Sequence, residues 1–431
     1  MSKEENRKNF SKYVSQNILG MIGFSCYVLA DSYFISIAKG ADGLTALNLV
    51  MPLYSIIFSI GEMIGVGSAI RYAISKIKKD ADADDYFWNA IIWCIMSSMI
   101  FVFAGIFFSA DIMRVLGADE HIVAVGNNYT KIFMCFAPMF MCNYVTNAFV
   151  RNDGAPGIAM SATLFSSLFN IVFDYILMFP MNLGMEGAAL ATALSPIIGM
   201  GICSIHFFSK KSSVRLVVCK PSVRKLVAGS QLGVSAFVGE MSSAVITLAF
   251  NFVILKLAGN VGVAAYGVVA NIAIVTTAVF NGVAQGSQPL ISSCFGRGDR
   301  DGCTQLKRMG YITAFVLAAV MYSILFIFAG QFVAVFNSEG SEMLRLYATE
   351  GVKLYFIGIF FAGINIVGGG AFSATEDAFK AAVVSVARGF VLILGAVFVM
   401  SALFGMTGVW LAYAVAEGIT TFIMLVMVLR V

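Results

Sequence analysis

Long apolar segments alternate with short polar connections along the whole chain. The apolar runs between charged, Gly or Pro positions are 14–37, 44–74, 87–109, 122–149, 157–179, 187–208, 226–257, 263–293, 309–330, 346–372, 381–402 and 408–429. Each run is long enough to cross about 30 Å of hydrocarbon as an α-helix. Backbone groups in lipid must bond within their own segment, and a helix satisfies them. The pattern therefore predicts an all-α integral membrane protein with twelve transmembrane helices.

Composition supports a lipid environment. Hydrophobic residues make up 59% of the 431 positions and charged residues 12%, whereas about 25% of residues are charged in soluble domains. The eight Cys residues lie in or beside apolar runs and lack the CxxC or Cys/His spacing of a zinc site. The polar N-terminus is followed by no small-residue cleavage pattern. We therefore expect the first apolar run to remain as a true span.

Positive charge is distributed unevenly between the connections. Of the 28 Lys and Arg residues, 21 lie at the termini or in one alternating set of connections, Arg151 among them. Six lie in the other set, and Arg388 alone falls deep within a predicted span. Connections rich in Lys and Arg face the cytoplasm. The sequence thus predicts a multi-pass protein of the plasma (inner) membrane with an even number of spans and both termini cytoplasmic.

The two halves of the chain resemble each other. The segment beginning at Gly40 matches the segment beginning at Gly259, an offset of 219, and Gly67 falls on Gly286 at the same offset. These matches predict an N-terminal six-helix half at 1–208, a basic cytoplasmic linker at 209–225 and a C-terminal six-helix half at 226–431. A parallel repeat of this kind is typical of transporters, in which a cleft between the halves alternates its access.

Ionisable residues within spans are costly and are therefore candidates for function. The deepest are Asp31, Glu62, Asp174, Glu240, Arg388 and Glu417. Asn170 and Asp174 are four residues apart and share one helix face. Their oxygen atoms suit a proton or a sodium ion, although a pair of interhelical hydrogen bonds explains them as well. Glu62 and Glu417 can equally bond to neighbouring helices, and Arg388 can pair with an acid or extend toward the membrane surface.

Several segments resemble the multidrug and toxic compound extrusion (MATE) transporters over nearly the whole chain. They are Leu29-Ala-Asp-Ser-Tyr-Phe-Ile, Gly40-Ala-Asp-Gly-Leu-Thr-Ala-Leu, the small-residue run 61–69, Asn147-Ala-Phe-Val-Arg-Asn-Asp-Gly-Ala-Pro, the pair Asn170 and Asp174, and Gly187-Ala-Ala-Leu-Ala-Thr. The family has two six-helix lobes around a V-shaped cleft and exchanges cations for organic solutes. The resemblance therefore implies antiport with H⁺ or Na⁺ as the coupling ion and no other cofactor.

The resemblance also implies roles for individual residues. Members with a cation site in the N-terminal lobe draw its ligands from helices one, five and six, which correspond here to Asp31, Asn170, Asp174 and Thr192, with any sodium held at Asp31 and Asp174. Tyr27 and Asn147 are expected in the surrounding polar network. Glu240 lies where other branches place a functional glutamate, and Glu62 and Arg388 are possible substrate contacts. The sequence departs from the family pattern in two places. Helix ten has no acid around Asn365, and helix one has no proline near its start.

Two other functions fit the sequence less well. An intramembrane protease is disfavoured, because its GxGD motif occurs here as Gly296-Arg-Gly-Asp299 in a basic loop, where helix capping or pairing within the loop explains Asp299 better. A flippase of lipid-linked saccharides shares the two-lobe architecture, but usually presents several basic residues to its cavity. The preferred function is export of small amphipathic, cationic organic compounds. We expect small-molecule substrates, a lipid bilayer, no nucleic acid and a monomer.

Overall fold

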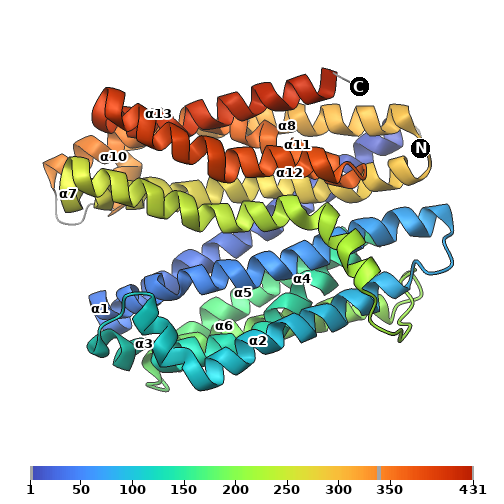
Figure 1. Cartoon of the computed structure of the whole chain (residues 1–431), viewed down its shortest axis with the longest axis horizontal. Coiled ribbons are helices and arrows are strands. Elements are labelled where there is room, and N and C mark those ends of the chain that lie inside the picture. Colours follow the sequence, from blue (N-terminus) through green and yellow to red (C-terminus); the bar gives the residue numbers. More distant parts are fainter. Residues whose placement is uncertain (1–2, 337–340, 430–431) are drawn as a thin grey trace.

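The computed structural model describes residues 3–336 and 341–429, and these residues form helices and connecting segments without strands. The elements, drawn in Figure 1, are α1 (Lys3–Lys78), α2 (Asp85–Val115), α3 (Glu120–Cys135), α4 (Ala137–Asn152), α5 (Pro156–Met178), α6 (Gly184–Phe207), α7 (Val223–Gly296), α8 (Arg300–Ile327), α9 (Ala329–Phe336), α10 (Glu342–Tyr355), η1 (Phe356–Gly358), α11 (Ile359–Ala374), α12 (Ala378–Val386), η2 (Ala387–Val391) and α13 (Leu392–Leu429). The predicted all-α membrane fold is confirmed.

The helices form two bundles that lie side by side in Figure 1. We call α1–α6 the first lobe and α7–α13 the second lobe. Each lobe has its own large core of buried apolar side chains. The non-helical segment between Phe207 and Val223 joins the lobes and overlaps the predicted linker, 209–225. The division of the sequence into two repeated halves remains a prediction.

Left-handed glycines recur at the spacing of the sequence repeat. Gly40 and Gly259, 219 residues apart, have φ values of 58° and 61°. Gly184 and Gly405, 221 residues apart, have φ values of 52° and 58°. L side chains rarely adopt this conformation, so glycine allows the chain to break its helix at the same point in each half. The offsets that match the sequences also match the backbone.

By length and composition, nine helices of the described residues can cross a membrane, or ten if the bent pair α3 and α4 is one span. Two of these nine are the runs Val223–Gly296 and Ala378–Val428. Each contains one glycine with non-helical angles, Gly259 in the first and Gly405 in the second. If each of these two runs is two spans, ten becomes the predicted twelve. The total of twelve itself remains a prediction.

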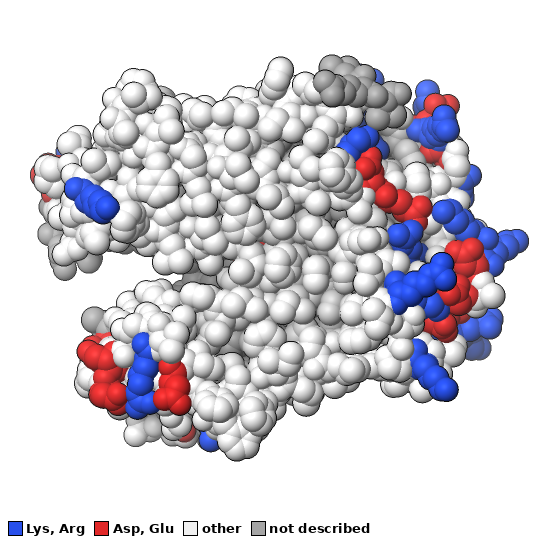
Figure 2. All heavy atoms as spheres, in the orientation of Figure 1, with Lys and Arg blue, Asp and Glu red and all other residues white. Residues whose placement is uncertain are grey.

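One end of the molecule carries most of the charged side chains, and a hollow opens between the lobes at the other end (Figure 2). The charged end holds the start of α1, the end of α13 and the connections after α1, α6 and α7 (Figure 1). There Glu376, in the turn after α11, pairs with Arg71 and Lys78 of α1. These ion pairs join the second lobe to the first at the end where the cleft is closed.

The lobes approach most closely where glycines of one lobe meet the backbone of the other. A Cβ at Gly67 of α1 would lie 2.1 Å from Gly229 O of α7, and a Cβ at Gly233 would lie 2.0 Å from Met63 O. The related glycine of the repeat, Gly286, lies against Val14. Small residues spaced by four allow such close helix packing in membranes. These two crossings close the cleft at the charged end.

Asp153, just beyond α4, fixes the linker to the first lobe. Its carboxylate accepts hydrogen bonds from Tyr72, His206, Ser212 and Ser213. The side chain of Asp153 is only 2% exposed. A carboxylate satisfied by this many donors holds the connection in one place. Asp299, in the basic loop after α7, caps α8 by accepting from Gly302 N at 2.8 Å, one of the two roles expected from the sequence.

Candidate functional site

The four predicted cation ligands lie together inside the first lobe. Asp31 comes from α1, Asn170 and Asp174 from one face of α5, and Thr192 from α6, and all four are buried. The Asn170 amide lies between the side chains of Asp174 and Thr192. In the orientation that satisfies both, its nitrogen donates to Asp174 Oδ2 and its oxygen accepts from Thr192 Oγ1, each at 3.1 Å. Helix spacing in α5 thus brings an amide and a carboxylate to one point.

Each carboxylate of this site keeps one free oxygen. Oδ1 of Asp31 and Oδ1 of Asp174 are buried and have no hydrogen-bond partner among the described residues. The two carboxylates interact electrostatically with each other. Buried acceptors are normally satisfied, and two negative charges that face each other favour a proton or a small cation between them. The residues present therefore fit the hard-oxygen site that a coupling ion needs.

A group of tyrosines surrounds these carboxylates. Tyr27 is one helical turn before Asp31 on α1, and it interacts electrostatically with Asp31, Asp174 and Glu240. The hydroxyls of Tyr54 and Tyr129 share a hydrogen bond and also feel the charge of Asp31. Tyr27 additionally lines the central pocket. It therefore lies between the carboxylate site and the cleft, and its part in a polar network around a coupling ion remains a prediction.

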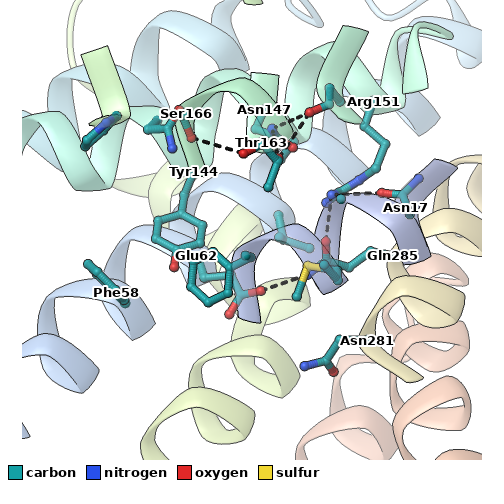
Figure 3. Close-up of a pocket in the computed structure, with 18 of the residues that line it drawn as sticks. Asn17, Phe58, Glu62, Tyr144, Asn147, Arg151, Thr163, Ser166, Asn281 and Gln285 are labelled. Atoms are coloured by element: carbon teal, nitrogen blue, oxygen red, sulfur yellow. Dashed lines mark hydrogen bonds between the residues drawn. The ribbon is translucent and has the colours of Figure 1, made fainter. Parts of the chain in front are cut away.

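Asn147, on α4, bonds to the neighbouring helix α5. Its side-chain nitrogen donates to Thr163 Oγ1 at 3.1 Å and to Ala159 O at 3.2 Å, both in α5 (Figure 3). The side chain of Asn147 lines the central pocket. Asn147 thus belongs to the wall of the cleft.

The central pocket lies at the base of the cleft, between the two lobes (Figure 3). Its aromatic wall consists of Phe24, Tyr27, Phe58, Phe140 and Tyr144. Its acidic residues are Glu62 of α1 and Glu240 of α7, one from each lobe, and their charges interact with each other. Aromatic faces combined with carboxylates attract organic cations. Both Glu62 and Glu240 also line a second pocket that extends into the second lobe.

Gln285 of the second lobe connects two charged residues of the first. Its Nε2 donates to Glu62 Oε1 at 3.1 Å, and its Oε1 accepts from Arg151 Nη1 at 2.7 Å (Figure 3). Arg151 also reaches Asn17 Oδ1 at 3.4 Å. The amide is matched to both charges, with its donor on the carboxylate and its acceptor on the guanidinium. This chain crosses the interface between the lobes at the base of the cleft.

Arg151 is buried inside the molecule, contrary to the position predicted for it from the sequence. The pattern of apolar runs places it in a cytoplasmic connection, leaving Arg388 as the single basic residue deep in a span. The structure instead places Arg151 in the last turn of α4, 5% exposed and lining the central pocket. The apolar run ends at residue 149. The sequence alone could not show that the next helical turn, which carries Arg151, is buried where the two lobes meet.

Arg388, on η2 at the wall of the second pocket, is paired with an acid. Its Nη2 donates to Glu417 Oε1 at 2.7 Å, and its Nε contacts the same carboxylate. Asn365 Nδ2 completes the set with a 2.7 Å bond to Glu417 Oε2. Of the two alternatives left open for Arg388, pairing is the one observed, and Glu417 bonds to neighbouring helices as anticipated.

We expect Arg388→Met to lower the free energy of unfolding by about 3–5 kcal/mol, because it leaves the Glu417 carboxylate buried without its cation. Replacing both residues, in Arg388→Met/Glu417→Met, should recover most of the loss. Denaturant unfolding of the detergent-solubilised protein, followed by tryptophan fluorescence, measures both. A single variant as stable as the wild type would show that the pair is not a stabilising contact.

The second lobe carries aromatic residues where the first lobe carries its cation ligands. At the offsets of the repeat, Asp31 corresponds to Phe250 and Thr192 to Tyr413. Phe250 stacks on Tyr266, and Tyr413 stacks on Tyr355 with ring centroids 4.4 Å apart. Gly395 and Ala396, near the position equivalent to Asp174, supply no ligand either. At these repeat-related positions, the described part of the second lobe thus has no counterpart of Asp31, Asp174 or Thr192.

The sequence is similar to that of known proteins. A sequence profile of the MatE family matches residues 17–176 and 236–399. The multidrug export protein MepA of Staphylococcus aureus is 27% identical over 414 residues, which cover 93% of this chain and 89% of that protein. The protein of the same name from Staphylococcus saprophyticus is 26% identical over 410 residues, with the same coverage.

Solved structures show the same fold. An outward-facing multidrug resistance MATE family transporter superposes with a TM-score of 0.92 at 20% identity, over 99% of this chain and 96% of that one. A transporter of the MOP superfamily from Pyrococcus furiosus, described as having a binding pocket of reverse polarity and a different function, gives 0.90 at 19% identity, over 98% and 95%. Because the profile matches most of the chain and both lobes, the protein belongs to the MatE family of membrane transporters and is not an enzyme, as the sequence predicts.

Proposed function

We propose that this protein is an antiporter that exports small amphipathic organic cations in exchange for protons or sodium ions. The observation that carries the proposal is the pair of buried carboxylates, Asp31 and Asp174, each with an unpartnered oxygen. Tyr27 connects them to a cleft lined by aromatic rings and by Glu62 and Glu240. A coupling site next to a substrate cleft is the arrangement that exchange requires. The export of several drugs is suggested by the names of the relatives.

The mechanism assigns separate tasks to the two groups of acids. Asn170, Asp174, Thr192 and Asp31 take up the coupling ion inside the first lobe. Glu62 and Glu240 attract the cationic group of the substrate, while the aromatic wall contacts its apolar body. Filling of the ion site changes the charge that Tyr27 faces, so the packing of α1 differs between the two states. An ion that binds one state more tightly shifts the equilibrium between states.

Orientation and assembly follow the distribution of charge. The charged end, with both ends of the described chain, is assigned to the cytoplasm of a cell with the protein in its plasma (inner) membrane. The cleft then opens to the outside. No described contact requires a second copy, and the protein is proposed to work as a monomer.

A flippase for lipid-linked saccharides is less well supported. Two arginines line the pockets, Arg151 in the first lobe and Arg388 in the second. They lie in different pockets, and Glu417 neutralises Arg388. Two carboxylates, Glu62 and Glu240, occupy the space shared by both pockets. A pyrophosphate group would meet these acids before it met two basic residues together.

Efflux of a fluorescent organic cation from proteoliposomes tests the proposal. Proton and sodium gradients are imposed separately, and the membrane potential is clamped. We expect export driven by one gradient, which identifies the ion. Equal rates with and without each gradient, for several cationic dyes, would refute cation-coupled export and return attention to the flippase.

A further inference from the structure

Arg151 is a buried charge that no acid of the described chain neutralises directly. It is 5% exposed, and its hydrogen bonds go to two amide oxygens, Asn17 Oδ1 and Gln285 Oε1 (Figure 3). Glu62 interacts with it electrostatically, but among the described residues the two are joined by hydrogen bonds only through the Gln285 amide. An unpaired ionised group in a low-dielectric interior is costly. The residue therefore calls for a partner that the chain itself does not provide.

The guanidinium also has donors to spare. It carries five N–H groups, and both of its bonds to the chain start from Nη1. Its Nε is buried and has no partner among the described residues. The position in the last turn of α4 makes the charge tolerable, because the carbonyl end of a helix stabilises a cation. The helix end thus stabilises the charge, but N–H groups of the guanidinium remain without an acceptor among the described residues.

Arg388 shows what a satisfied arginine looks like in this fold. Two of its nitrogens contact the Glu417 carboxylate, and Asn365 holds that carboxylate from the other side. Such a fork on a carboxylate is the geometry that guanidinium groups favour. Arg151 faces the cleft with the same chemistry and no carboxylate. The contrast indicates an anionic group of a ligand as its missing partner.

We propose that Arg151 is the anion-recognition residue of the cleft and binds the carboxylate of a zwitterionic, amphipathic substrate. The inference rests on the proposed function, and it adds a second charged group to the substrate. The ammonium group lies toward Glu62 and Glu240, and the apolar body lies against the aromatic wall. Asn147, Thr163 and Ser166 line the same pocket and offer polar atoms beside the carboxylate.

The polarity of the pocket fits a ligand with charges at both ends. Acids and a guanidinium line a single pocket, and Gln285 keeps Glu62 and Arg151 from collapsing into an ion pair. A ligand carboxylate at Arg151 replaces the acceptor that Gln285 supplies. A ligand ammonium at Glu62 replaces its donor. Glu62 and Arg151 are then each paired with an opposite charge of the ligand, whereas a ligand with a positive charge alone leaves Arg151 without an anionic partner.

A matched pair of dyes tests this inference. One is a rhodamine with a free benzoate, and the other is its methyl ester, which has the same body and no negative charge. Binding of both to the detergent-purified protein is measured by fluorescence anisotropy for wild type, Arg151→Met and Arg151→Lys. Arg215→Met removes an exposed arginine of the linker and controls for the loss of one positive charge.

Arg151→Met is expected to weaken binding of the acid dye by at least about tenfold, the effect of losing a charged hydrogen bond. Binding of the ester should change less than about twofold, and Arg215→Met should change neither. Arg151→Lys, which keeps the charge in case the Met variant does not fold, should lose only part of the acid affinity. Equal effects on both dyes, or no effect on either, overturn the inference. Gradient-driven export of the ester by the wild type would leave the proposed function standing in that case.

Discussion

Asp31→Asn is expected to reduce gradient-driven export to the background level while leaving the protein folded. Asparagine has nearly the same shape as aspartate but cannot lose a proton, and it supplies one carbonyl oxygen in place of a carboxylate. The buried Oδ1 of Asp31 has no hydrogen-bond partner among the described residues, so the change breaks no hydrogen bond of that oxygen. Removing one of two facing carboxylates also removes the electrostatic reason for a cation to bind there.

The measurement is efflux from proteoliposomes under the gradient that drives the wild type, with dye binding as the test of folding. A potential of 100 mV contributes about 2.3 kcal/mol for each net charge moved, but nothing to a one-for-one exchange of monovalent cations. The pH or sodium gradient is therefore varied with the potential clamped. Asp80→Asn, the same change at an exposed position, serves as the control. Undiminished gradient-driven export in Asp31→Asn would remove Asp31 from the coupling site.

The fold could be predicted because the bilayer restricts it. Twenty or more apolar residues without charge allow only a helix, and every predicted run is largely helical in the structure, although the runs 122–149 and 309–330 are each divided between two helices. The repeat could be recognised in the sequence because a backbone position with positive φ favours glycine. Gly40 and Gly259 therefore mark the same helix break in both halves. The four cation ligands were found through the resemblance and through the helical spacing of Asn170 and Asp174. Their burial together agrees with that expectation, and their role in coupling remains a prediction.

The contacts between the lobes could not be predicted in the same way. Gln285 is an uncharged residue in a polar stretch, and only the packed structure shows it between Glu62 and Arg151. Arg151 lies just past the end of an apolar run, where sequence indicates a loop. The stacked aromatic pairs of the second lobe, Phe250–Tyr266 and Tyr355–Tyr413, could not be predicted, because aromatic residues are common in any membrane helix. One available signal was overlooked, namely the glycines four residues apart at Gly229 and Gly233.

Those glycines lead to the second prediction with a large effect. Gly67→Ala is expected to hinder closure of the charged end and to suppress export. The added Cβ would lie 2.1 Å from Gly229 O and 2.7 Å from Gly233 N. Both are backbone atoms, so no side-chain rotation relieves the overlap. Alanine is the better helix former by about 1 kcal/mol, so the helix itself is not weakened and the cost falls on the contact between the lobes.

An overpacked contact costs about 1–3 kcal/mol, which shifts the equilibrium roughly five- to 150-fold toward states in which the lobes separate at this end. Spin labels at Lys79 and Asp301, in a background without native cysteines, report that separation as a longer distance by electron–electron double resonance. Gly267→Ala places a Cβ on the segment of α7 that follows the break at Gly259, with no atom within 4 Å outside its own helix backbone, and should change neither distance nor export. An unchanged distance in Gly67→Ala would mean that the crossing yields without opening. The glycines would then be a packing feature of each state, with no part in the choice between states.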